Sequence, residues 1–373
     1  MSLICALAAF FRKPGSGASG IEMAVENTKR VADPAPGPLF IVSVWRGGSS
    51  LLYALLNKHP QIGLMYEADL VLLRPVFLKP AGVNDWAERW ELWNEALSRH
   101  GLDGSEFAAE IPEFRNALEA VHKEYARRKG AVIWGDKSPN YHDQLEQMAK
   151  DFPRARFLIV WRNPLGTIGS TIRAAATGNS YFRKRGMPLR SLLGYRTLKS
   201  QCGKIVAAGA AVHQVHYEDL VSDTANVIRG VCEFLGVRYD DSLCTLEGAD
   251  RSAVYEGRHH TLLGEDVIFA GPRPDVIETS LRLKIEHYMT LWRETDPEEY
   301  ETDSPGKTPT AGEMRADLIR YRLCRTLDAF IRLAFCFLPI PLLRLYRKVK
   351  TRAYAANAGR DAAESLPARS LRG

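Results

Sequence analysis

The residues best suited to chemistry lie in the stretch Trp45–Leu52, which reads WRGGSSLL. Two adjacent glycines let the backbone approach a ligand closely, and serine hydroxyls with one guanidinium add donors and positive charge. The stretch follows an apolar run and precedes a helical pattern, so its N–H groups should face an anion at the positive end of a helix dipole. We therefore expect an anion-binding loop, with a plain tight turn as the alternative. The candidate ligands are Arg46, Gly47, Gly48, Ser49 and Ser50.

The loop lacks the Gly-Lys-Ser/Thr triplet that holds a triphosphate and its magnesium ion, because Ser49 follows Gly48 directly. A sulfuryl group carries less negative charge than a terminal phosphoryl group, so arginine, lysine and backbone donors suffice without a metal. The six cysteines form no CxxC pair and no Cys/His cluster at metal-ligand spacing. The loop thus favours a phosphosulfate, and we expect no metal.

A second candidate anion site follows the apolar run 156–161. Arg162 comes directly after that run, and Ser170 lies eight residues later, in the first turns of the next expected helix. A guanidinium and a hydroxyl at a helix N-terminus suit a nucleotide phosphate. Arg173, one turn further, could assist, and the alternative is a solvated turn.

Short apolar runs alternate with helical patterns along much of the chain. Strands that alternate with helices favour a parallel sheet covered on both faces, so we expect the α/β class. Gly236 ends one of the helical patterns as a C-terminal cap. The expected strands are residues 39–44, 131–134, 156–161 and 212–217, and the clearest expected helices are residues 49–59 and 224–235.

Three stretches resemble the signature motifs of sulfotransferases that use 3′-phosphoadenosine 5′-phosphosulfate (PAPS). They are WRGGSSLLYALLNKHPQI, RFLIVWRNPLGTIGSTIR and VHYEDLVSDTANVIRGVCEFLGV, in the family's order, and they cover about residues 39–240. The match is closest to the bacterial branch that shares its pattern with tyrosylprotein sulfotransferases. The chain departs from the family pattern at Trp45, Gly47 and Asn163. The resemblance implies a P-loop-like parallel sheet flanked by helices, with a helical insertion on the acceptor side.

The resemblance also implies how a nucleotide is held. Residues 46–50 would hold the 5′-phosphosulfate of PAPS. Arg162 and Ser170 would hold the 3′-phosphate, and Tyr217 lies where the family places a nucleotide-contacting tyrosine.

Three residues take catalytic roles by the same resemblance. Glu67 would accept the proton of an acceptor hydroxyl as its oxygen attacks sulfur in line, while Arg46 and Lys137 stabilise the developing charge. Alternatively, Glu67 is an exposed acidic residue at a helix start and Lys137 is a surface lysine. The expected reaction is sulfuryl transfer from PAPS to a hydroxyl acceptor, a lipid or a saccharide, with release of 3′,5′-bisphosphoadenosine.

Two other functions fit parts of the sequence. Residues 131–136 (AVIWGD) superficially resemble a Walker B strand whose aspartate could hold magnesium, as in a P-loop kinase. The missing Gly-Lys-Ser/Thr argues against this kinase. A membrane-peripheral protein that binds nucleotide without catalysis is the other alternative.

Composition excludes several classes of protein. The chain has 373 residues, 46% apolar and 25% charged, with a net charge of +6. These values exclude an intrinsically disordered protein, a collagen-like repeat and a polytopic membrane protein. The modest basic excess indicates an anionic partner but does not choose among a nucleotide, a membrane surface and nucleic acid. From the motifs above and the C-terminal segment described below, we expect the nucleotide and a membrane surface and not nucleic acid. The expected parts are a flexible lead-in (1–38), a sulfotransferase-like α/β domain (39–296) with a helical acceptor region (70–130), a linker (297–314), a basic apolar helical segment (315–352) and a tail (353–373).

Residues 315–352 differ in character from the rest of the chain. Arginines and lysines bracket an apolar run, residues 333–343, which Pro339 and Pro341 interrupt and which is too short to span a bilayer. Such a segment suits an anionic membrane surface. The alternative is a C-terminal helix packed on the protein's own core.

Two features bear on the compartment. The apolar run at residues 3–11 is followed, not preceded, by basic residues, which predicts neither a secretory signal nor a spanning helix. Scattered single cysteines suit a reducing compartment. We therefore expect a cytoplasmic protein, peripheral on the inner face of the membrane.

Overall fold

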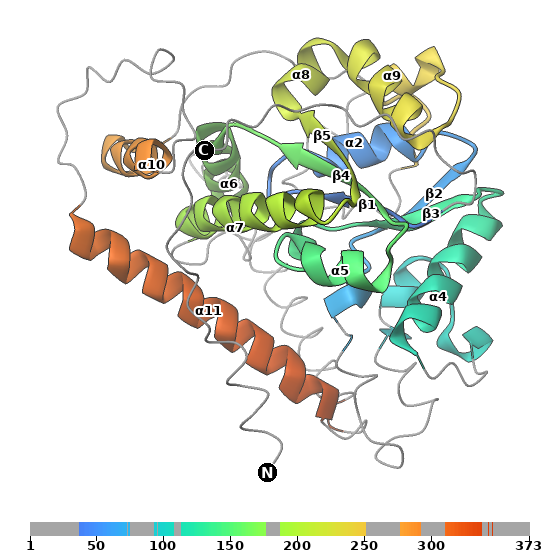
Figure 1. The fold of residues 1–373 in the computed structure, drawn as a ribbon, viewed down its shortest axis with the longest axis horizontal. Coiled ribbons are helices and arrows are strands. Elements are labelled where there is room, and N and C mark those ends of the chain that lie inside the picture. The colour runs from blue at the N-terminus through green and yellow to red at the C-terminus, as the bar shows by residue number, and fades with distance from the viewer. Residues whose placement is uncertain are drawn as a thin grey trace, which may run out of the picture. The chain divides into compact units, whose positions relative to one another are not determined.

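Five parallel strands form the centre of the computed structural model, in the order β2-β3-β1-β4-β5 (Figure 1). The model describes residues 37–72, 74, 93–94, 96–107, 113–176, 187–250, 277–291, 310–337, 342 and 345. The chain divides into residues 1–33 and residues 34–373, and every described residue lies in the second unit. Most of the expected lead-in and linker, the centre of the expected acceptor region and the whole tail lie outside the described residues.

The strands are short, and β1 to β4 are almost wholly buried, as parallel strands covered on both faces should be, whereas the edge strand β5 is partly exposed. Their bounds are β1 Leu39–Val42, β2 Ile62–Tyr66, β3 Ile133–Lys137, β4 Arg156–Trp161 and β5 Ala211–His216. In the central strand β1, Leu39 and Ile41 pack into one apolar cluster while Phe40 and Val42 pack into another. The sheet therefore separates two cores.

Helices cover both faces of the sheet (Figure 1). On the Leu39 side lie α2 (Ser49–Leu56), α8 (Tyr217–Ser222) and α9 (Thr224–Leu235). On the Phe40 side lie α4 (Phe114–Arg128), α5 (Leu145–Asp151) and α7 (Met187–Ala207). The remaining elements are α6 (Pro164–Ala176), α10 (Thr279–Leu291), α11 (Ala311–Phe337) and the short 3-10 turns η3 (Gly104–Phe107), η4 (Pro139–Tyr141) and η5 (Asp241–Cys244). The α/β class with a parallel, helix-flanked sheet is thus confirmed.

Local signals located some elements accurately. β4 and α9 have the predicted bounds, because β4 is apolar from Phe157 to Trp161 and α9 carries a cap at each end. At its start the Asp223 side chain accepts from the Asn226 N–H, and at its end Gly236 adopts φ 68°. β2 was not predicted, although its sequence IGLMY is apolar throughout.

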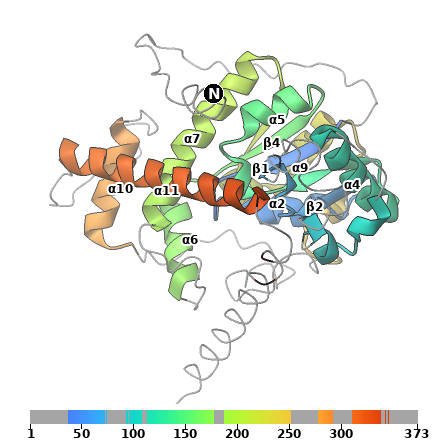
Figure 2. The same ribbon diagram turned by 90° about the horizontal axis from the view of Figure 1, so that it is seen from below.

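The basic apolar segment forms a helix over much of its length. α11 begins at Ala311, inside the expected linker, and contacts α7 (Figure 2). None of the helices in the described part of the chain is long and apolar enough to cross a bilayer.

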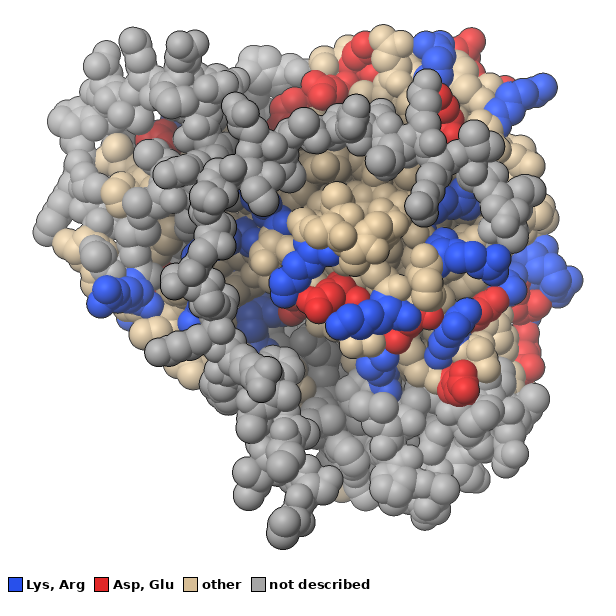
Figure 3. Space-filling view, in the orientation of Figure 1, with Lys and Arg blue, Asp and Glu red and all other residues tan. Residues whose placement is uncertain are grey.

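Charges on the face drawn in Figure 3 are of mixed sign. On the surface between α5 and α7, Glu146 pairs with Lys150 at 3.2 Å and with Lys204 at 3.0 Å. Such pairing limits the net potential over α5 and α7. The cationic groups described next lie at one edge of the sheet.

Candidate functional site

At or near the carboxyl end of each of the five strands lies a residue that the sequence analysis proposed for the functional site. Because the strands are parallel, their carboxyl ends meet at one edge, where α/β proteins bind ligands. β1 lies between β3 and β4, so the loop after β1 is at the point where the chain changes direction across the sheet. The five residues, in the order β1 to β5, are Arg46, Glu67, Lys137, Arg162 and Tyr217.

The loop after β1 is compact and ends in the first turn of α2. The Gly47 N–H donates to the Val44 carbonyl at 3.0 Å, and the Ser43 hydroxyl donates to Ser49 Oγ at 3.0 Å. Gly48 is the N-cap of α2 with φ 96°, and no side chain caps the helix. The N–H groups of this first turn are therefore not satisfied by a capping side chain, as an anion site requires.

Gly48 lies in close contact with the Tyr217 ring. A Cβ placed on Gly48 would lie 2.2 Å from Cδ2 of Tyr217. The Tyr217 ring in turn faces the Arg162 guanidinium, with 4.0 Å between the guanidinium carbon and the ring centroid. The loop after β1 and the residues after β4 and β5 thus form one packed unit.

We predict that Gly48→Ala destabilises the protein by about 3 kcal/mol, because alanine adds left-handed strain and a collision with Tyr217. The matched control is Gly236→Ala, where φ is 68° and nothing lies within 4 Å of the added Cβ. For that control the free energy of unfolding should fall by only about 1 kcal/mol, since the alanine adds left-handed strain but no collision. Urea unfolding measures both, and equal losses would show that the Tyr217 contact is unimportant.

The two candidate anion sites touch each other. Nε of Arg46 donates to Oγ of Ser170 at 3.1 Å, and Nη1 of Arg162 donates to the Arg46 carbonyl at 3.1 Å. Burial lowers the pKa of Arg46 to about 10, with Arg162 and Arg173 contributing by charge repulsion. The cluster is therefore strongly cationic, and a bound anion would relieve that repulsion.

Glu67 and Lys137 form an ion pair, with Nζ of Lys137 2.6 Å from Oε1 of Glu67. The lysine side chain is 1% exposed and the glutamate side chain 25% exposed, so the carboxylate is the member that reaches solvent. Burial alone lowers the pKa of Lys137, but Glu67 and Tyr66 outweigh it and the pKa lies above its usual value. Lys137 is thus a buried cation and not a surface lysine.

Tyr66 was missed by the sequence analysis and connects the ion pair to the loop. Its hydroxyl lies 2.9 Å from Oγ of Ser50, and Nζ of Lys137 lies 4.1 Å from its ring centroid. Burial raises the pKa of Tyr66, so the hydroxyl stays protonated. The available signal was an aromatic residue at the end of an apolar run, directly before the candidate base.

Backbone strain coincides with the candidate residues. Among the described residues, the non-glycine residues with positive φ are Arg46 (65°), Glu67 (49°) and Asp69 (56°). Left-handed backbone costs an ordinary residue about 1–2 kcal/mol and is found preferentially at functional sites. The strain therefore points to the same edge of the sheet as the motifs do.

The departures from the family pattern fit locally. The Trp45 ring packs against His142, with centroids 4.9 Å apart. A Cβ on Gly47 would lie 3.0 Å from the Ser43 hydroxyl, so the loop leaves little room there. Asn163 Oδ1 accepts from the Leu165 N–H at 2.8 Å and so caps the start of α6, as an aspartate would.

Asp136, the aspartate that would hold magnesium if the protein were a P-loop kinase, is fully buried. It accepts from the hydroxyl of Tyr141 and, at 3.4 Å, from the Ala68 N–H. Burial, followed by repulsion from Asp69, raises its pKa to about 7. This carboxylate belongs to an interior network. In the part of the chain that the structure describes, no group of three or more His, Cys, Asp or Glu is arranged to hold a metal.

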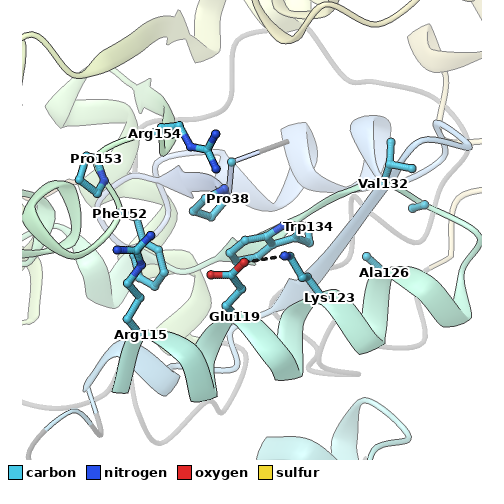
Figure 4. A pocket seen from close by; sticks show the side chains of 12 residues that line it. Pro38, Arg115, Glu119, Lys123, Ala126, Val132, Trp134, Phe152, Pro153 and Arg154 are labelled. Atoms are coloured by element: carbon cyan, nitrogen blue, oxygen red, sulfur yellow. Dashed lines mark ion pairs between the residues drawn. The ribbon is translucent and has the colours of Figure 1, made fainter. Parts of the chain in front are cut away.

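A pocket of about 580 Å³ lies at the opposite edge of the sheet (Figure 4). Its walls include Pro38 just before β1, Arg154 just before β4 and Trp134 near the start of β3. From α4, Glu119 and Lys123 line it as an ion pair. The amino-terminal ends of parallel strands meet here, so this pocket is separate from the candidate site.

Comparisons with solved structures find sulfotransferases. The sulfotransferase domain of the olefin synthase of Synechococcus PCC 7002 is 21% identical, with a TM-score of 0.49 over 70% of this chain and 96% of that one. The sulfotransferase domain from the curacin biosynthetic pathway is 17% identical, with a TM-score of 0.48 over 70% and 99%. A sulfotransferase from Alicyclobacillus acidocaldarius is 17% identical, with a TM-score of 0.37 over 69% and 92%.

A comparison with curated proteins finds no match. The family model described as "Sulfotransferase family" matches residues 38–241, which is more than half of the chain. This match spans all five strands and every candidate site residue. The chain therefore belongs to the sulfotransferase family.

Proposed function

We propose that the protein transfers a sulfuryl group from PAPS to a hydroxyl acceptor on a lipid or saccharide and releases 3′,5′-bisphosphoadenosine. The observation that carries this proposal is the direct contact between the two anion sites, through Arg46 with Ser170 and Arg162 with the Arg46 carbonyl. Two cationic sites in contact suit one small molecule with an anionic group at each end, and PAPS is such a molecule.

The residues present fit this donor. Gly48 and the first turn of α2 offer N–H groups to the phosphosulfate, and Arg46 adds a guanidinium. Arg162 and Ser170 would contact the 3′-phosphate, and Tyr217 packs beside Arg162. Burial and, after it, repulsion from Arg162 lower the pKa of Arg46, and a bound anion would offset that repulsion.

Glu67 serves as the base in the proposed reaction. Its Oε1 is held by Lys137 at 2.6 Å, which orients the carboxylate and leaves Oε2 to accept the hydroxyl proton. The acceptor oxygen forms a bond to sulfur as the bond between sulfur and the bridging phosphate oxygen breaks, and the electron pair leaves with that phosphate. The bound donor supplies the activated sulfuryl group.

Lys137 and Arg46 stabilise the negative charge that develops during transfer. Lys137 is buried and stays protonated, because its pKa is raised by Glu67 and Tyr66 against the effect of burial. A buried cation acts more strongly than an exposed one, since less water screens it. The chain thus needs only its own side chains and backbone donors for charge stabilisation.

We expect Tyr66→Phe to lower kcat about tenfold, because it removes the hydroxyl that joins Ser50 to the ion pair while it keeps the ring. The matched control is Tyr53→Phe. Tyr53 packs against Tyr66 with centroids 5.0 Å apart, and its hydroxyl donates to the Leu64 carbonyl. Steady-state kinetics of both variants measure the difference, and equal loss of kcat in both would contradict a specific role for Tyr66.

The reaction itself is tested with the full chain and ³⁵S-labelled PAPS in the presence of a chelator. Membrane extracts supply lipid and saccharide hydroxyls, and mass spectrometry identifies the labelled product. We expect label in an extractable lipid or saccharide, with an equal amount of bisphosphate released. Label transfer from γ-³²P-ATP with magnesium, and none from PAPS, would support the kinase and overturn the proposal.

A further inference from the structure

α11 has two chemically different faces. At 3.6 residues per turn, positions 317, 321 and 325 lie on one side of the helix, and positions 319, 323, 327 and 330 lie on the opposite side. The first set contacts the rest of the described protein, and the second is exposed to solvent.

Polar contacts attach the first face to its neighbours. Asp317 pairs with Lys284 of α10 and lies 3.4 Å from the Tyr288 hydroxyl. On the α7 side, the Tyr321 hydroxyl lies 3.3 Å from Oγ1 of Thr197. Arg325 pairs with Asp143, ahead of α5. The orientation of α11 about its own axis is thus set by polar groups.

The opposite face of α11 carries large apolar side chains that are exposed to solvent. Ile319, Leu323, Leu327 and Phe330 are 56%, 63%, 57% and 65% exposed. We call these four residues the apolar stripe. Among the described residues, the other large apolar side chains with such exposure are Val132, Val206, Leu342 and Leu345. A contiguous stripe of this kind marks an interaction surface.

Arginines border the apolar stripe on both sides. Arg315 and Arg322 lie along one margin and Arg320 along the other, and all three are exposed. No acidic side chain described between residues 315 and 327 lies on the exposed face. Glu313, at the start of the helix, accepts from the N–H and hydroxyl of Thr310 as a cap.

We propose that the apolar stripe of α11 lies in the interface of an anionic lipid bilayer, with its bordering arginines on the lipid headgroups. Apolar side chains bordered by basic residues match the acyl boundary and the charged layer of such a bilayer. A second copy of the chain fits less well, because pairing two such faces would bring arginines together without acidic partners. The inference is independent of the proposed reaction.

Flotation of the full chain with vesicles tests the proposal. The vesicles are phosphatidylcholine alone, or phosphatidylcholine and phosphatidylglycerol in equal amounts. We expect binding to the anionic vesicles and little to the neutral ones. Leu323→Ser with Leu327→Ser should weaken binding at least about tenfold. Arg320→Gln with Arg322→Gln should weaken it about fivefold for each arginine.

Matched controls separate this surface from general effects. Val132→Ser with Val206→Ser removes exposed apolar side chains elsewhere, and Arg127→Gln with Arg229→Gln removes exposed charge elsewhere. Both should bind like the unsubstituted protein, and circular dichroism checks that every variant is folded. Absence of binding to anionic vesicles, or unchanged binding by the Leu323/Leu327 variant, would overturn the proposal. So would an oligomer that this variant dissociates without lipid, since a second copy would then cover the stripe.

Discussion

Replacing Glu67 by glutamine is expected to lower kcat by about 10²–10⁴-fold and to leave the affinity for PAPS nearly unchanged. Glutamine keeps the size of the side chain and can still accept from Lys137, which lies 2.6 Å from Oε1. It cannot take up the proton of an acceptor hydroxyl. Single-turnover kinetics with labelled PAPS measure the chemical step, and isothermal titration measures donor affinity.

The matched control for Glu67→Gln is Glu146→Gln. Glu146 also pairs with lysines, but it does so on the surface between α5 and α7. We expect no change in kcat for this control. Retained turnover in Glu67→Gln would show that another group is the base. Weakened donor binding at unchanged kcat would instead place Glu67 in the nucleotide site.

Replacing Arg162 by glutamine should weaken PAPS binding about 10–100-fold, because it removes a charge-assisted contact to the 3′-phosphate. The diagnostic comparison is adenosine 5′-phosphosulfate, which lacks the 3′-phosphate. Its affinity should change little in the variant. The unsubstituted protein should therefore discriminate between the two donors, and the variant should not, as competition binding assays will measure.

Arg156 provides the control for Arg162, since the two arginines mark the two ends of β4. Nη1 of Arg156 donates to the Leu235 carbonyl at 2.6 Å, much as Arg162 donates to the Arg46 carbonyl. Arg156→Gln should leave both donor affinities intact. If Arg162→Gln weakens the binding of both donors equally, Arg162 acts by supporting the loop at Arg46 and not by contacting the 3′-phosphate.

Strands and helices with local signals were predictable from the sequence, and so was the edge of the sheet that holds the site. The run 156–161 and the capped helix 224–235 needed no knowledge of distant residues. The order of the strands places the residues after them at one edge, and that consequence of parallel strands follows from the α/β class alone. The motifs were therefore enough to predict that Arg46 and Arg162 lie near the ends of strands.

Contacts between distant residues were not predictable in the same way. β2 is a five-residue apolar run, and its pairing with β3 depends on packing between segments about 70 residues apart. Because β2 was not predicted, the catalytic role of Glu67 was supported only by the family resemblance, and the sequence indicated no role for Tyr66. The burial of Lys137 also depends on the sheet around it, which is why a surface lysine remained an alternative.

The C-terminal segment shows the same limit. Its composition predicted a basic, apolar helix, but not which side would face the protein. The side of α11 that faces the protein is set by Asp317, Tyr321 and Arg325, whose partners lie on α10, on α7 and ahead of α5. Packing of the opposite side on the protein's own core would have buried Ile319, Leu323, Leu327 and Phe330, and the structure leaves these four side chains exposed.

Because one site residue lies at or just after the end of each parallel strand, the two edges of the sheet differ in the insertions and deletions that they can accept. A residue inserted within β3 would shift the following chain by about 3.3 Å and turn Lys137 to the other face, away from Glu67. A residue inserted at 208–210, between α7 and β5, would be absorbed by an exposed turn at the far edge. Insertions and deletions among natural variants of this chain should therefore gather at the edge where the strands begin.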